Sequence, residues 1–169
     1  MRQEGTLTWD LLQGNLDRQI DAYQRLDQLL ANENQVLIDH HVASLITITS
    51  CKEQLNQELQ TLRDHYFHIV KQIVLDERPD QITVESLIGW APNAYRNALI
   101  NGKDQLERLA RNIQKKNTIN QGLLEQSMRY VSYMVKKIIE LSNEPQQVYC
   151  QRGYQQTLGE SKTLMNVVA

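Results

Sequence analysis

The sequence predicts an all-α protein, an elongated antiparallel hairpin or bundle of long helices with coiled-coil-type packing and a flexible C-terminal tail. The chain has three prolines, at positions 79, 92 and 145, so two long windows lack the strongest helix breaker. Within both windows apolar residues recur every three or four positions, the spacing of one helix face. Seven glycines, one Phe and many straight-chain residues favour long helices over a sheet core.

The first window, about residues 8–76, carries an apolar seam in its second half. Its spacings alternate between three and four, which is the a/d repeat of a supercoiled helix. The seam consists of Leu45, Ile48, Lys52, Leu55, Leu59, Leu62, Tyr66, Ile69 and Ile73. Lys52 is its one polar member. We interpret Lys52 as a residue that sets the register, with its stem packed and its ammonium group reaching towards water.

The first half of this window has the same spacing in a different phase. Its members are Trp9, Leu12, Leu16, Tyr23, Leu26, Leu30 and Leu37. The two phases differ by a small insertion near residues 38–44, as a stutter in a heptad repeat produces. The helix then runs straight through, bends there, or breaks near residues 32–34. We expect one continuous helix over residues 8–76, in which packing overrides the strand-like propensity of residues 43–49.

Residues 77–91 are expected to connect this helix to a second one over residues 92–142. Residues 77–81 have the composition of a turn, Thr83 is placed to cap a short helix through Ile88, and Gly89 is placed to end it. Pro92 suits the first turn of the second helix. That helix has an apolar stripe of Leu99, Leu106, Leu109, Ile113, Leu124, Val131, Met134, Ile138 and Leu141.

The stripe of the second window passes Gly102 without a change of phase. The helix is therefore expected to continue through this glycine at a cost of about 1 kcal/mol. Two long helices, each with one apolar stripe, are expected to cover each other's stripes. Residues 1–145 would then form a helical bundle, and residues 146–169 a separate tail.

Few residues are placed for chemistry. His65 and His68 lie three positions apart, so a helix would put them on one face, but no Glu-x-x-His or cysteine partner accompanies them. Nucleotide-binding glycine loops and nucleophile motifs are absent from the sequence. We therefore expect no catalytic residue, no metal and no cofactor, and we do not expect an enzyme.

Charge and hydropathy point to an ordinary soluble protein. The net charge of −2 does not suit a nucleic-acid partner. No run approaches the roughly 18 apolar residues of a membrane span, and the N-terminal residues lead into no signal-peptide core. Cys51 and Cys150 stand alone and are interpreted as free thiols. The expected location is the cytoplasm.

The tail over residues 146–169 differs from the rest of the chain. Gly153 and Gly159 disfavour a continuous helix, and the end of the tail is apolar. A polar segment tipped with apolar residues is typical of a segment that folds on binding, and the alternative is a frayed terminus without a role. The residues expected to contact a bound protein are Leu158, Leu164, Met165, Val167 and Val168.

Three motifs, in order and spacing, carry a resemblance to a known family. The first is Glu33-x-x-x-Leu37, followed by Leu45 and by Ile48-Thr49-x-x-Lys52. The second is Asn117-x-x-Asn120-x-x-Leu123-Leu124-Glu125, and the third is Tyr149-x-x-x-Gly153. Together, over residues 33–153, they resemble the FlgN family of flagellar type III export chaperones.

The resemblance implies a function in protein export. Such chaperones hold hook–filament junction proteins in the cytoplasm, prevent their premature assembly and deliver them to the cytoplasmic domain of the export gate. It implies that the tail takes part in client capture and that Tyr149 contacts the gate. The motif residues Glu33, Leu37, Lys52, Asn117, Asn120 and Gly153 are assigned to structure rather than to partners.

Two other classes of protein remain open at this point. A structural or adaptor coiled-coil protein would satisfy its seams between chains, for example as a homodimer. A helical-bundle enzyme or metal sensor would need an inward cluster of Glu and His.

Overall fold

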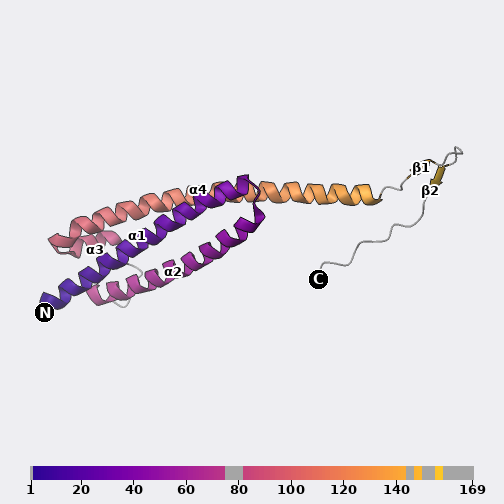
Figure 1. Cartoon of the computed structure of the whole chain (residues 1–169). Coiled ribbons are helices and arrows are strands. Elements are labelled where there is room, and N and C mark those ends of the chain that lie inside the picture. The colour runs from indigo at the N-terminus through magenta and orange to yellow at the C-terminus, as the bar shows by residue number, and fades with distance from the viewer. Residues whose placement is uncertain (1, 75–81, 144–146, 150–154, 158–169) are drawn as a thin grey trace. The chain divides into compact units, whose positions relative to one another are not determined.

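Four helices make up most of the computed structural model, which describes residues 2–74, 82–143, 147–149 and 155–157 (Figure 1). The helices are α1 (Arg2–Ile38), α2 (Val42–Val74), α3 (Val84–Trp90) and α4 (Asn93–Asn143). Two three-residue strands follow, β1 (Gln147–Tyr149) and β2 (Gln155–Thr157). The prediction of an all-α protein built from long helices is confirmed. The chain divides into two compact units, Met1–Leu124 and Glu125–Ala169.

The first window forms two helices rather than one. The prediction of a continuous helix over residues 8–76 is wrong at residues 39–41, where the chain turns back between α1 and α2. The turn lies within the region where the two heptad phases disagree, and not at residues 32–34. Residues 43–49 are helical, as predicted.

The turn is a helix C-cap that uses a histidine where glycine is usual. His40 has a φ of 55°, in the left-handed region. The backbone N–H of His41 donates to the carbonyl of Val36 at 3.1 Å, and that of His40 donates to Leu37 at 3.4 Å. These two bonds are the Schellman pattern, which satisfies carbonyls at the end of α1. The His41 carbonyl then accepts from Leu45 at 3.3 Å and so starts α2.

Helices α1, α2 and α4 pack side by side in the first unit (Figure 1). The amide of Asn15 donates to the Leu62 carbonyl at 3.1 Å, and Lys52 reaches Glu33, so α2 runs antiparallel to α1. Gly102 lies against Leu16, and Asn120 lies against Leu30, so α4 runs parallel to α1. The sequence analysis expected one pair of long antiparallel helices, whereas the first unit is a bundle of three long helices.

The apolar residues of both phases in the first window line the interior of this bundle. One core cluster lies around Leu12 and Leu87, and a second lies around Leu30 and Leu59. The first cluster is formed by Trp9, Leu12, Leu16, Ile20, Ile69, Val70, Leu87, Ala91 and Leu99. The second is formed by Ala22, Leu26, Leu30, Leu55, Leu59, Leu62 and Ile113. Both sequence phases are therefore correct, and each covers the other across the turn.

Helix α3 lies between α2 and α4 in the chain and packs against the first core cluster. Thr83 is its N-cap, as predicted, and its hydroxyl oxygen accepts from the Ser86 N–H at 3.2 Å. The helix does not end at Gly89 but continues to Trp90. Lys103 of α4 forms an ion pair with Glu85, and this hydrogen bond holds the pKa of the Glu85 carboxyl below its usual range. Leu87 anchors the apolar side of α3, with 2% of its surface exposed.

Helix α4 continues through Gly102, as predicted. At this position the glycine allows close packing against α1. A Cβ atom at position 102 would lie 2.3 Å from Cδ2 of Leu16. The missing side chain therefore admits Leu16, and α1 and α4 approach each other more closely than they otherwise could.

The second unit contains the last part of α4 and the two strands. The strands pair antiparallel, with Gln147 opposite Thr157 and Tyr149 opposite Gln155. The sequence showed no strand pattern here, because three-residue strands are too short for an alternation to be visible.

Candidate functional site

Glu33, Lys52 and Asn120, taken from three different helices, meet inside the bundle. The Lys52 Nζ donates to both carboxylate oxygens of Glu33, at 2.9 and 3.0 Å. The amide of Asn120 donates to Glu33 Oε2 at 2.9 Å and to the Leu30 carbonyl at 2.8 Å. Asn34 in turn donates to Asn120 Oδ1 at 2.9 Å. We call these four residues the polar cluster.

Two members of the polar cluster are buried, and their burial gives the cluster its structural effect. Glu33 is 9% exposed and Asn120 is 4% exposed, so the carboxylate depends on its two donors in place of water. A buried polar network tolerates only the register that satisfies it. The cluster therefore fixes how α1, α2 and α4 slide along one another.

The other motif residues lie in different surroundings. Leu37 is buried at the end of α1, next to the turn. Asn117 is exposed on α4, and its assignment to packing remains a prediction. Tyr149 is the last residue of β1, whereas Gly153 lies outside the described residues.

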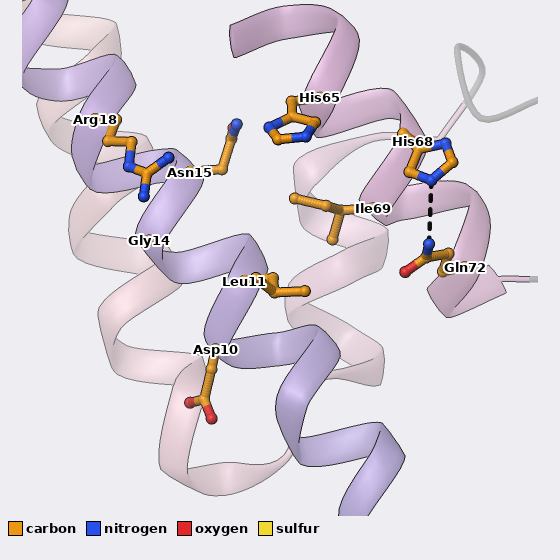
Figure 2. Close-up of a pocket in the computed structure, with 9 residues that line it drawn as sticks. All are labelled: Asp10, Leu11, Gly14, Asn15, Arg18, His65, His68, Ile69 and Gln72. Atoms are coloured by element: carbon orange, nitrogen blue, oxygen red, sulfur yellow. Dashed lines mark hydrogen bonds between the residues drawn. The ribbon is translucent and has the colours of Figure 1, made fainter.

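A groove between α1 and α2 contains both candidate histidines (Figure 2). Its volume is about 270 Å³. Asp10, Leu11, Gly14, Asn15 and Arg18 of α1 form one wall, and His65, His68, Ile69 and Gln72 of α2 form the other. His68 and Gln72 share a hydrogen bond at 3.2 Å. Within the part of the chain that the structure describes, no three His, Cys, Asp or Glu side chains are grouped as metal ligands.

A second pocket, of about 240 Å³, opens into the apolar core among the four helices. It is lined by Leu12, Leu16, Gln19, Arg63, Tyr66, Phe67, Val84, Leu87, Leu99 and Leu106. Burial raises the pKa of the Tyr66 hydroxyl above its ordinary value, so this phenol remains protonated at neutral pH. The pocket is lined mostly by apolar side chains, as a packing defect in a hydrophobic core is, and its polar residues form no catalytic arrangement.

The last part of α4, residues 125–143, presents an exposed apolar surface. We call these residues the α4 extension. The prediction that the other long helix covers the stripe residues of this part, Val131, Met134, Ile138 and Leu141, is wrong. Every large apolar residue from Met128 to Leu141 is at least 41% exposed. They are Met128, Tyr130, Val131, Tyr133, Met134, Val135, Ile138, Ile139 and Leu141.

Seven of these residues lie together on one side of the helix. At 3.6 residues per turn, Met128, Val131, Met134, Val135, Ile138, Ile139 and Leu141 fall within an arc of about 160°. We call them the apolar band. The charged residues of the extension lie on the remaining arc, including Arg129, Lys136 and Glu140. An amphipathic helix with its apolar side exposed is the form in which a helix binds another protein.

What covers this apolar band is the point on which the sequence analysis was wrong. The stripe itself was visible in the sequence, but the periodicity of an apolar stripe does not say what covers it. The tail residues expected to bind a client, Leu158, Leu164, Met165, Val167 and Val168, lie outside the described residues. Among the described residues, no helix has both the length and the hydropathy of a membrane span.

Comparison with known proteins gives one match. The family model described as FlgN protein matches residues 8–157, which is most of the chain and includes all three motifs. No curated protein and no solved structure matches the chain. The chain therefore belongs to the FlgN family of flagellar export chaperones.

Proposed function

We propose that this protein is a cytoplasmic chaperone that binds hook–filament junction proteins and delivers them to the export gate. Family membership supports a chaperone of flagellar export in general. The single observation that favours client binding is the exposed apolar band of the α4 extension. In a soluble protein, an exposed apolar surface of this size usually marks a site where a partner protein binds.

The apolar band captures the client in this proposal. Junction proteins that assemble through their terminal helices have apolar faces that must be covered before export. An amphipathic client helix laid along the band would exclude water from both apolar faces. The tail residues Leu164, Met165 and Val168 also contact the client, and Tyr149 contacts the export gate.

Calorimetric titration of the full chain with a junction protein tests the capture surface. Val131→Ala/Ile138→Ala removes the centre of the band, and we expect the affinity for the client to fall a hundredfold or more. Arg129→Ala/Lys136→Ala on the opposite face is the matched control, with an expected change below about threefold. If the wild-type chain binds no junction protein, the proposed function is wrong.

The same titrations separate capture from delivery. Leu164→Ala/Met165→Ala/Val168→Ala should weaken client binding and leave binding to the cytoplasmic domain of the gate unchanged. Tyr149→Ala should leave client affinity within about threefold and weaken binding to the gate. Loss of both activities in both variants would show that the tail is needed for folding and not for recognition.

A further inference from the structure

The apolar band of the α4 extension is too wide for one partner helix. A two-stranded coiled coil buries a narrow seam of a and d positions, which is two residues in seven. Between Met128 and Leu141 the band has seven residues in fourteen. Its arc of about 160° exceeds what one helix covers by roughly a half.

Six of the seven band residues form two overlapping seams, each with the spacing of a coiled coil, and Ile139 lies at one edge of the band outside both seams. Seam one is Met128, Val131, Val135 and Ile138, with spacings of three, four and three. Seam two is Val131, Met134, Ile138 and Leu141, with the same spacings. The seams share Val131 and Ile138, and their mid-lines differ by about 60° around the helix axis.

This angle is the one that a three-helix bundle requires. Three parallel or antiparallel helices in contact form a triangle, so each sees its two neighbours about 60° apart; a four-helix bundle would need about 90°. We infer that the α4 extension binds a partner segment that supplies two packed amphipathic helices, one on each seam, and so completes a three-helix bundle. This inference rests on the proposed function, because it takes the partner to be an export client.

The first unit contains the same arrangement built from this chain alone. There α4 is covered by α1 and α2, an antiparallel pair joined by the turn at residues 39–41. Ile113 of α4 packs in one cluster with Leu26 and Leu30 of α1 and with Leu55 and Leu59 of α2. An antiparallel helical pair in the client would therefore cover the α4 extension as α1 and α2 cover the preceding part of α4. Three copies of the extension would satisfy the same angle and are the competing arrangement.

Seam-specific substitutions distinguish one bound helix from two. Met128→Ala/Val135→Ala removes residues found only in seam one, and Met134→Ala/Leu141→Ala removes residues found only in seam two. All four are exposed, and alanine preserves helix propensity, so neither variant is expected to unfold the chain. The probe is a junction-protein terminal segment long enough for two helices, titrated by calorimetry against the full chain. Arg129→Ala/Lys136→Ala is again the control.

We expect both double substitutions to lower the affinity by tenfold or more and the control to change it by less than threefold. If only one double substitution weakens binding, one helix is bound and the inference is wrong while the proposed function stands. If neither does, the band is not the capture surface. Sedimentation of the chaperone alone completes the test: a trimer that both double substitutions dissociate would show self-assembly in place of a two-helix client.

Discussion

Glu33 is the residue on which the polar cluster depends, because its carboxylate is buried between three helices. Lys52 neutralises it with two short hydrogen bonds, and Asn120 supplies a third. The Lys52 side chain is itself 27% exposed, so it is only partly buried. The pair thus combines a buried acceptor with a partly solvated donor, an arrangement that avoids the full desolvation cost of two charges.

Lys52→Met should lower the free energy of unfolding by about 1–3 kcal/mol, because it leaves the buried Glu33 carboxylate without its counter-charge. Chemical denaturation measures the loss, and the exposed Lys115→Met is the matched control, with a change below about 0.5 kcal/mol. In Glu33→Gln/Lys52→Met the charge that needs a partner is gone. We therefore expect the double variant to lose less than the sum of the single losses. Additive losses would show that Glu33 and Lys52 do not interact.

The sequence singled out Glu33, Lys52 and Asn120 as motif residues, but it did not predict that their side chains contact one another. Lys52 interrupts an apolar seam, so a special role was predictable from its position. Glu33 lies on α1, and the register of α1 against α2 depends on the turn at residues 39–41. Without that turn no pairing of Glu33 with Lys52, 19 positions later, could be derived.

At the scale of elements, the helix boundary that the sequence did not reveal is the one at His40. Proline and glycine are the usual signals of a helix end, and this turn has neither. Histidine adopts the left-handed conformation more often than most residues but gives no recognisable pattern. The only sign in the sequence was the change of heptad phase, which a bend, a break or a stutter all produce. The second helix, with a uniform phase, was predicted to within a residue at each end.

Two glycines of α4 allow a prediction about helix packing. Gly102→Ala adds a Cβ atom 2.3 Å from the buried Leu16, whereas at Gly122 the added atom would meet nothing within 4 Å. Gly122→Ala should stabilise the protein by about 0.5–1 kcal/mol through helix propensity. Gly102→Ala has the same gain, but displacing Leu16 costs about 1–3 kcal/mol, so we expect a net loss. Thermal unfolding of both variants decides this; equal stabilisation would show that Leu16 moves aside without cost.

At the scale of the whole molecule, the buried core and the proposed recognition surface belong to different parts of the chain. Both core clusters and the polar cluster lie between Trp9 and Asn120. Over residues 121–142, the part of the chain after Asn120 whose burial is described, no residue is buried. The apolar residues of the α4 extension could be read from the sequence, but their exposure could not, because it depends on where α1 and α2 end. The apolar pattern of a helix indicates that one face is to be covered, but it does not indicate whether the same chain or a partner covers it.

This division predicts the behaviour of a chain shortened to residues 1–124. The fragment keeps every buried residue of the bundle, so its thermal midpoint should lie within roughly 3 °C of the full chain, a change of about 1 kcal/mol or less. It lacks the apolar band, so calorimetry should show no binding of the junction protein. Circular dichroism checks that the fragment is helical and unfolds in one transition. A fragment that is unfolded would mean that the residues after Leu124 stabilise the bundle, and a fragment that still binds the client would place the capture surface within residues 1–124.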